Sequence, residues 1–238
     1  MLSSRSFDRN FFFVIVSLNL LGVMVPRTVT SQETVASPEA NAAADHDATK
    51  DFVPLFDGKS LSGWEGAVDD YEVVDGSIQC KKGRGGNLYT REIFEDFTVR
   101  LEFQLPPRGN NGLAIRFPGG KADPAYAGMC ELQVLDNSHP DYASLDDRQY
   151  HGSAYGMVPA IRGALKPTGQ WNQQEVTVRG STIRVTLNGQ EILNADLSKV
   201  TEFAGDRPHP GKDRTDGPFV FAVHSSPVKF LNNEIKRL

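Results

Sequence analysis

Short runs in which apolar and polar residues alternate recur along the chain from residue 52 to the C-terminus. The clearest is TVRLEFQL, in which Val99, Leu101 and Phe103 share one face of a strand and charged or amide side chains share the other. STIRVTLNGQEIL places Asn188-Gly189 between two such runs, and YEVVDGSIQC has the same form around an Asp-Gly dipeptide. Both dipeptides are strong β-hairpin signals. The pattern predicts antiparallel strands joined by tight turns.

No run longer than one or two turns has the 3.6-residue period of a helix. The C-terminal segment GPFVFAVHSSPVKFLNNEIKRL adds two strand-like runs around a turn at residues 225–227. Many short strands separated by turn signals are typical of two packed sheets. We therefore predict an all-β fold, a two-sheet antiparallel β-sandwich of the jelly-roll kind.

The first 31 residues have the form of a targeting segment. Arg5 and Arg9 precede an apolar run over residues 11–25, which is shorter than the ~20 residues that a membrane-spanning helix needs. Small residues follow, ending at Ser31. We expect a signal peptide over residues 1–31, export to the periplasm or medium, and no stable membrane insertion after its removal. A short uncleaved anchor is the alternative.

Residues 32–50, QETVASPEANAAADHDATK, have no apolar period and predict a disordered linker. One domain over residues 51–238 follows. The net charge of −5 makes nucleic acid an unsuitable partner. Cys80 and Cys130 either pair or remain as two buried thiols, and the sequence leaves both open. It does not indicate an oligomeric state.

The strand CELQVL poses the functional question. Glu131 and Gln133 lie on the face opposite Cys130, Leu132 and Val134. GLAIRF and FVFAVHS have the same form, a bulky apolar face opposite a face of small residues with one polar group. The polar groups of the three strands are Arg116, Glu131, Gln133 and His224. We expect them to converge on a concave binding floor, and an ordinary solvated face is the alternative.

Residues 137–170 break the alternation and hold several aromatic side chains, including Tyr142 and Tyr155. A loop of this length inside a compact domain is usually functional. The following tract, ALKPTGQWNQQEVTVRG, places Lys166 and Trp171 at the entry to a strand. Trp171 is either a core anchor or a platform on which a sugar stacks.

The segments FVPLFDGKSLSGW, NNGLAIR, CELQVLDNSHP, GSAYG, ALKPTGQWNQQEVTVRGSTIRVTLNGQEI and PVKFLNNEIKRL occur in this order. Together they resemble the 3-keto-disaccharide hydrolase domain family over roughly residues 52–238. The resemblance implies the concanavalin A-like lectin/glucanase fold, in which two curved antiparallel sheets hold sugar on the concave side. It also implies a carbohydrate substrate.

The resemblance extends to single positions. The matched polar residues around the central strand are Glu131, Gln133, Asp136 and Asn137. Arg116 follows Asn110-Asn111-Gly112, which matches a turn of the family, and Tyr155 matches the tyrosine of its GAIYG motif. Lys166 and Trp171 match its KPxGxWN motif. His224 is matched too, but VHSS replaces the family's DHG, which places the local geometry of that loop in question.

These matches imply catalytic roles for Glu131, His224 and Arg116. Substrate-binding roles follow for Gln133, Asp136, Asn137, Tyr155, Lys166 and Trp171. Laminarinase-like glucanases carry two outer carboxylates on this strand, whereas Glu131-x-Gln133-x-x-Asp136 has an amide and a shorter acid. A retaining glycosidase needs two carboxyl groups roughly 5–5.5 Å apart, so this set fits poorly.

A 3-keto sugar offers another route, because its ketone acidifies the proton on C2. One base, Glu131 or His224, then removes that proton and the C1–O bond breaks by elimination, after which water can add. Arg116 and His224 would hold the enolate, or a divalent metal on Glu131, Asp136 and His224 would. We predict an exported hydrolase, or lyase and hydratase, that cleaves 3-keto glycosides. A non-catalytic, lectin-like domain is the alternative.

Overall fold

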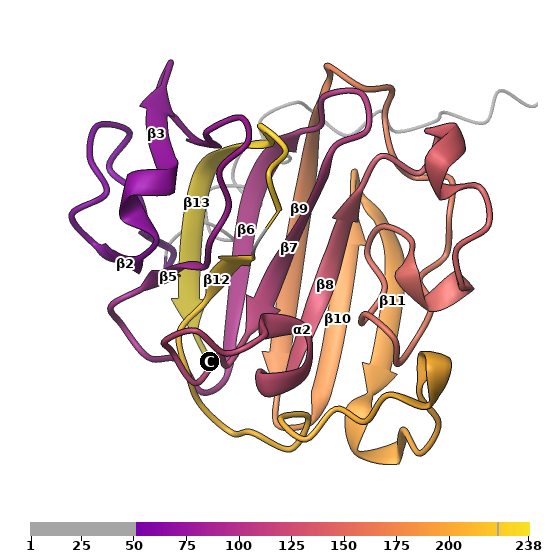
Figure 1. Cartoon of the computed structure of the whole chain (residues 1–238). Helices are drawn as coiled ribbons and strands as arrows, with labels where there is room; N and C mark the ends of the chain where they lie inside the picture. Colours follow the sequence, from indigo (N-terminus) through magenta and orange to yellow (C-terminus); the bar gives the residue numbers. More distant parts are fainter. Residues whose placement is uncertain (1–50, 223) are drawn as a thin grey trace, which may run out of the picture. The chain divides into compact units, whose positions relative to one another are not determined.

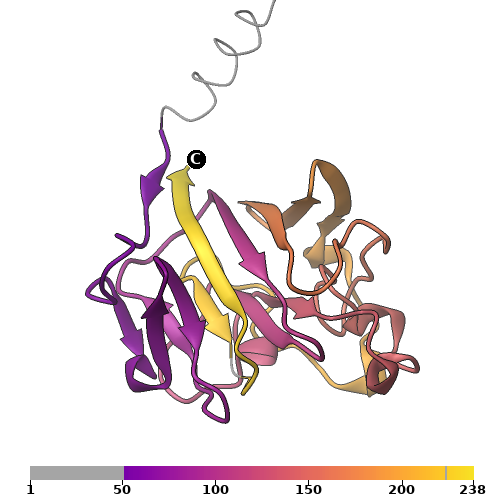
Figure 2. The ribbon, with the colours of Figure 1, turned by 90° about the horizontal axis from the view of Figure 1, so that it is seen from above.

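The computed structural model of this chain describes residues 51–222 and 224–238. The leader expected over residues 1–31 and the linker expected over residues 32–50 lie outside the described residues. Two antiparallel sheets make up the described part, with very little helix, so the prediction of an all-β two-sheet sandwich is confirmed (Figures 1 and 2). In this part of the chain no helix has the length and apolar character to span a membrane.

The larger sheet has eight strands in the order β11-β10-β9-β6-β13-β4-β3, with β1 paired to β13. Its strands are β1 (Val53–Pro54), β3 (Tyr71–Val74), β4 (Ser77–Cys80), β6 (Phe97–Gln104), β9 (Trp171–Arg179), β10 (Thr182–Leu187), β11 (Gln190–Asp196) and β13 (Lys229–Arg237). Its two predicted hairpins are present. Asp75 and Gly76 join β3 to β4 with φ of 50° and 74°, and Asn188 and Gly189 join β10 to β11 with φ of 50° and 84°. Two left-handed residues in succession are what a type I′ turn requires.

The smaller sheet has five strands in the order β2-β5-β12-β7-β8. Its strands are β2 (Trp64–Gly66), β5 (Leu88–Thr90), β7 (Asn110–Ile115), β8 (Cys130–Leu135) and β12 (Val220–Ala222). Short helical turns lie in the connections: α2 (Pro124–Ala127), η1 (Val68–Asp70), η2 (Pro140–Tyr142), η3 (Asp147–Gln149), η4 (Leu197–Lys199) and η5 (Ala204–Asp206). The segment that matches a family turn, residues 110–112, is the first half of β7, because the chain turns earlier, at residues 106–109.

The main core lies between the sheets. It joins residues such as Val99 and Phe103 of the larger sheet to Leu113, Leu132 and Phe221 of the smaller one. This burial stabilises the fold by about 25 cal/mol for each Å² of apolar surface that is removed from water, and it is the main stabilising contribution to such a fold.

Trp64 and the two cysteines are all buried in the main core. Trp64 is a core residue, since it is 1% exposed and stacks on Phe221 with ring centroids 5.1 Å apart. Cys80 and Cys130 are both buried and free, so they do not form a disulfide.

The expected faces of GLAIRF need one correction. Leu113 and Ile115 face the main core as predicted, but Phe117 lies in a second apolar cluster with Ala114. Arg116 has a left-handed φ of 51°, which rotates the chain by half a strand period just after β7 ends. Alternation therefore fails at this position.

Candidate active site

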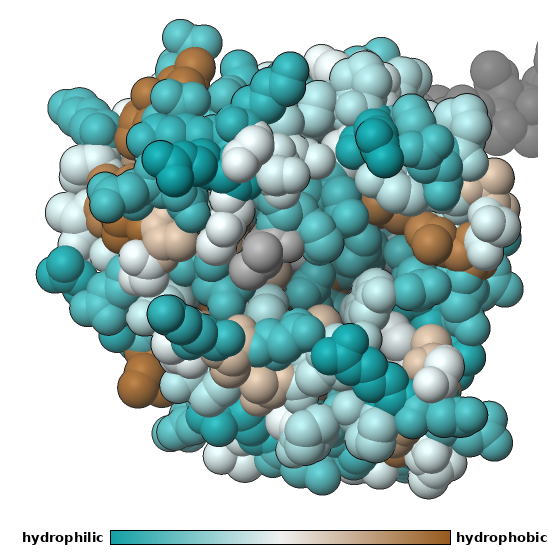
Figure 3. Space-filling model, in the orientation of Figure 1, coloured by the Kyte–Doolittle hydropathy of each residue, from teal (hydrophilic) through white to brown (hydrophobic). Residues whose placement is uncertain are grey.

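A cavity of about 910 Å³ opens over the smaller sheet. It is visible as the central hollow in Figure 3, where hydrophilic residues surround much of it. Its volume is that of a small-molecule site, which is commonly 300–1,000 Å³. Three of the expected site residues on or after the strands line it, namely Glu131, Gln133 and His224. Tyr155, from the long loop, lines it too.

Two rows of paired residues cross the smaller sheet beneath this cavity. The first row, from β8 to β5, is Glu131, Ala114, Val220 and Tyr89. The second row begins with Gln133, Gly112 and Ala222, and continuing the register of Phe221 with Leu88 by one residue brings Asn87 to its end. The Glu131 side chain lies over Gly112, and Ala114 and Ala222 are buried. We call Glu131 and Gln133 the β8 wall, and Tyr89 and Asn87 the β5 wall.

Glu131 is the most unusual group in the cavity. Its side chain is 5% exposed, and within residues 51–222 and 224–238 it has no hydrogen-bond partner. It lies over Gly112, where a Cβ would overlap its carboxyl group. Desolvation raises the pKa of Glu131 from 4.5 to about 8, and the negative charge of Asp123 adds a smaller contribution. A carboxyl with this pKa exchanges a proton near neutral pH.

The replacement Gly112→Ala is expected to displace the Glu131 carboxyl and lower turnover, because Glu131 and a new Cβ cannot occupy the same space. Gly63→Ala is the matched control, since the nearest atom to a Cβ there is 3.8 Å away. Steady-state kinetics and urea unfolding of both variants test this. If Gly112→Ala behaves like Gly63→Ala, the packing of Glu131 on Gly112 is not needed. The same conclusion follows if Glu131→Ala, added to Gly112→Ala, does not restore the stability that Gly112→Ala loses.

Gln133 is held beside Glu131 with an acceptor left free. Its Nε2 donates to Oδ1 of Asn110 at 2.9 Å, while its Oε1 is buried without a partner among the described residues. The side chain is 4% exposed. A buried acceptor without a partner is costly in the empty protein, so it is a natural site for a substrate hydroxyl.

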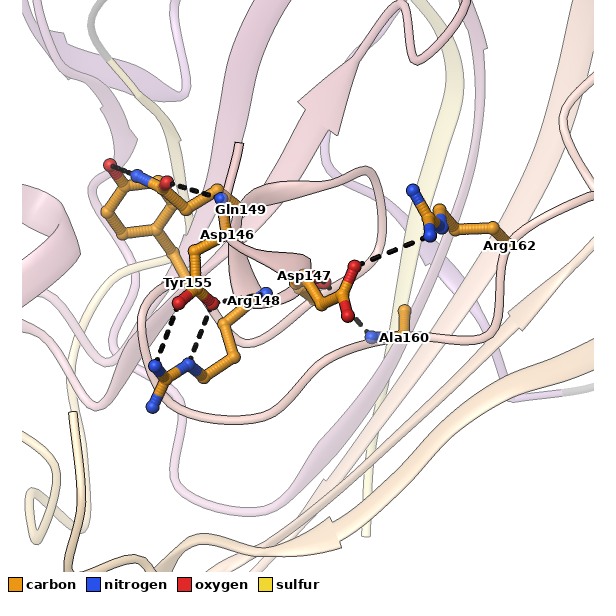
Figure 4. A network of polar contacts seen from close by, with 8 residues as sticks. Asp146, Asp147, Arg148, Gln149, Tyr155, Ala160 and Arg162 are labelled. Carbon is orange, nitrogen blue, oxygen red and sulfur yellow. Dashed lines mark hydrogen bonds and ion pairs between the residues drawn. The ribbon is translucent and has the colours of Figure 1, made fainter. Parts of the chain in front are cut away.

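Tyr155 is positioned by the same strand. Its backbone N–H donates to the carbonyl oxygen of Glu131 at 2.8 Å, because residues 152–155 run along the free edge of β8. Its phenol oxygen accepts a hydrogen bond from Nε2 of Gln149 at 2.7 Å (Figure 4). Gln149 is fixed in turn, since its Oε1 accepts from the backbone N–H of Asp146 at 3.2 Å. The phenol proton of Tyr155 therefore remains available to the cavity.

His224 and a group of rim residues complete the cavity. Burial lowers the pKa of His224, and Asp123 partly opposes this, so His224 is neutral at pH 7. Asp123 caps α2 by accepting from the N–H of Ala125 at 3.2 Å, and it pairs with Arg207 at 3.2 Å. The Arg207 guanidinium lies 3.4 Å from the centre of the Tyr126 ring. Asp123, Tyr126 and Arg207 line the cavity, and sequence reasoning missed them.

The comparisons with known proteins agree with this geometry. A family model described as the 3-keto-alpha-glucoside-1,2-lyase-like domain matches residues 51–236. The chain belongs to this family.

A curated relative in this comparison is the 3-keto-disaccharide hydrolase of Bacteroides thetaiotaomicron. It is 28% identical over 228 residues, which cover 79% of this chain and 78% of the relative. Two solved structures from Parabacteroides distasonis, whose assignment as glycosyl hydrolases is provisional, are also similar. One is 23% identical with a TM-score of 0.70, covering 79% of this chain and 99% of its own; the other is 28% identical with a TM-score of 0.61, covering 79% and 84%. This chain is thus a carbohydrate-active, glycosyl-hydrolase-like protein.

Arg116 does not reach the cavity, which corrects the expected position of this family-matched residue. Its side chain is 3% exposed, and three segments of the chain hold its guanidinium. It donates to the carbonyl oxygens of Glu95, Gly180 and Arg214 at 2.8–3.0 Å and to the carboxylate of Asp96 at 2.9 Å. The left-handed backbone at this position turns the side chain away from the face that strand alternation assigns to it. Arg116 therefore joins the segments that contain Glu95, Gly180 and Arg214.

Asp136 and Asn137 follow β8 but do not line the cavity. The carboxylate of Asp136 accepts from the backbone N–H of Arg108 at 2.9 Å and from Ser138. Asn137 Oδ1 accepts from the backbone N–H of His151 at 2.9 Å. In the described structure both side chains fix turns around the site, where a family motif had suggested direct contact with substrate.

Lys166 and Trp171 also lie away from the residues that line the cavity. Lys166 Nζ donates to the carbonyl oxygen of Trp171 at 3.0 Å, and Trp171 begins β9 of the larger sheet. Neither is therefore positioned to contact a sugar held over the smaller sheet.

Glu131, Asp136 and His224 are the conceivable ligands of the alternative with a divalent metal; Glu131 and His224 line the cavity, whereas Asp136 does not and its carboxylate accepts from the N–H of Arg108 and from Ser138. Within the described ranges, no cluster of three or more His, Cys, Asp or Glu side chains is arranged to hold a metal ion. These three residues therefore do not form a metal site together, and the steps below are written for protein groups.

Proposed function

We propose that this chain cleaves the glycosidic bond of a 3-keto glycoside in the cavity, with Glu131 as the base. One observation carries the proposal: a buried carboxyl without a partner among the described residues faces a substrate-sized cavity, with a pKa of about 8. A general base works best when its pKa lies near the operating pH. The description of the family and the name of the Bacteroides relative support a 3-keto substrate.

The reaction begins when the Glu131 carboxylate takes the proton from C2 of the sugar. The electron pair forms a C2–C3 double bond, and the ketone oxygen carries the negative charge of the enolate. When the ketone re-forms, a C1–C2 double bond is made and the C1–O bond breaks. The leaving oxygen then takes a proton, which gives an unsaturated ketone and the released alcohol or sugar. Water added across C1–C2 completes a net hydrolysis.

Donors along the cavity replace Arg116 in this mechanism. The phenol of Tyr155 holds a free proton, and its backbone is bonded to that of Glu131, so base and donor keep a fixed separation. His224 in its neutral form offers a ring N–H to the enolate oxygen. We assign Tyr155 to the leaving oxygen and His224 to the enolate.

Two other functions fit the cavity less well. Asp70 and Asp123 are the other carboxylates among the described residues that line it, and Asp123 is already engaged by Arg207, which disfavours a two-carboxylate hydrolysis. A lectin-like domain uses ionised carboxylates as hydrogen-bond acceptors. It gains nothing from an unpaired carboxyl whose pKa is raised by burial to about 8.

The decisive experiment incubates the purified protein with a disaccharide and with its 3-keto form, each with and without a chelator. We expect release of the second sugar from the keto form, because only the ketone makes the C2 proton acidic. Mass spectrometry of the products separates the unsaturated ketone from the hydrated sugar. Equal turnover of the unmodified disaccharide would contradict the elimination mechanism, and binding without turnover of either compound would favour the lectin-like alternative.

A further inference from the structure

A second unpartnered acceptor lies in the cavity, opposite Gln133. Asn87 is 8% exposed, and its Oδ1 has no hydrogen-bond partner among the described residues. Its Nδ2 donates to the carbonyl oxygen of Ala122 at 3.1 Å, so the amide is held by its donor side. Gln133 is held in the same manner by Asn110. Both residues line the cavity, and each keeps a buried carbonyl oxygen without a hydrogen-bond partner among the described residues.

The two amides are at opposite ends of one row across the sheet. Gly112 and Ala222 separate them, so the row spans three strand-to-strand steps, which is about 14 Å at the usual spacing. The carboxyl group of Glu131 lies over Gly112, between the two amides. One pyranose ring is too short to place hydroxyl groups against both oxygens, whereas two linked rings can do so.

We propose that Asn87 belongs to a second sugar subsite, in which its Oδ1 accepts a hydrogen bond from a hydroxyl of the leaving ring. Gln133 then serves the keto ring beside Glu131. The proposal rests on the proposed function, and it makes Asn87 a specificity-determining residue. A substrate without that hydroxyl leaves a buried acceptor unpaired, and sites built in this way discriminate strongly against such analogues.

The test compares a 3-keto disaccharide with the methyl glycoside of the same 3-keto ring, which has no second ring. Asn87→Leu removes the acceptor at similar size. We expect it to lower the ratio of kcat/KM for the disaccharide to kcat/KM for the methyl glycoside by about 10- to 100-fold. Asn87→Asp keeps an acceptor but loses the bond to Ala122, and it should retain most of the ratio. Gln133→Leu should reduce turnover of both substrates.

An unchanged ratio in Asn87→Leu would overturn the proposal. So would a parallel loss on both substrates in Asn87→Leu and Asn87→Asp, since that result means Asn87 only holds the loop at Ala122. Turnover of the methyl glycoside by the wild-type protein tests the proposed function separately. If neither substrate is turned over, the proposed function fails, and the same ratio is then read from dissociation constants measured on Glu131→Gln with and without the Asn87 changes.

Discussion

Glu131→Gln is expected to lower the rate on a 3-keto glycoside by roughly 10²–10⁴-fold, the usual contribution of a positioned general base. Glutamine preserves the shape of the side chain that lies over Gly112 but cannot accept the C2 proton. Affinity for the substrate should change far less than kcat, because the walls and floor of the cavity remain in place. Steady-state and single-turnover kinetics check both. A variant with wild-type activity would remove Glu131 from the mechanism.

The same replacement should also stabilise the protein at high pH, so unfolding would not explain a loss of activity in this variant. Burial raises the pKa of Glu131 from its ordinary value of 4.5 to about 8. Between these values the folded state keeps a proton that the unfolded state has lost, so stability falls as pH rises through this window. Above pH 8 this effect lowers the free energy of unfolding of the wild-type protein by about 3–5 kcal/mol, and the glutamine variant does not lose this stability.

Urea unfolding at pH 4 and pH 9 checks this expectation. Wild type and Glu131→Gln should differ little at pH 4, and the variant should be the more stable protein at pH 9. Equal stability at both pH values would mean that Glu131 ionises normally in the fold, and the argument from its burial would fail.

Arg116→Met is expected to destabilise the fold by about 2–5 kcal/mol, because each buried carbonyl oxygen left without its donor costs about 1–3 kcal/mol, while Asp96 at 36% side-chain exposure adds little. The change leaves three carbonyl oxygens and the Asp96 carboxylate without the guanidinium that joins them. Arg91→Met is the matched control. Its pair with Glu65 spans 3.4 Å between exposed side chains, and such pairs contribute about 1 kcal/mol or less.

Denaturant unfolding of the two arginine variants gives the comparison, and activity is measured per folded molecule. We expect the folded fraction of Arg116→Met to retain turnover, because the side chain lies outside the cavity. A large loss of kcat with little loss of stability would instead mean that Arg116 takes part in the reaction.

Sequence alternation predicted the fold and the β8 wall correctly, because one buried face specifies a strand's register. It failed at Arg116, where a single left-handed residue reversed the faces. Motif matching located Asp136 near the site but did not predict its role. A motif does not distinguish a carboxylate that fixes a turn from one that contacts substrate. Asn87 and Asp123 were missed because their positions depend on loops from distant parts of the chain. The Gly-Asn step before β5 was the only available signal for Asn87.

Residues that line the cavity come from two sides of the row that runs through Gly112 and Ala222. Groups assigned to proton transfer cluster on β8 and the segment bonded to its edge, whereas Asn87 and Tyr89 come from another strand. Mutations on β5 and its flanking loops can therefore change which second sugar is accepted without disturbing the base. Such a division would let the preference for the second sugar change while the proposed reaction stays the same.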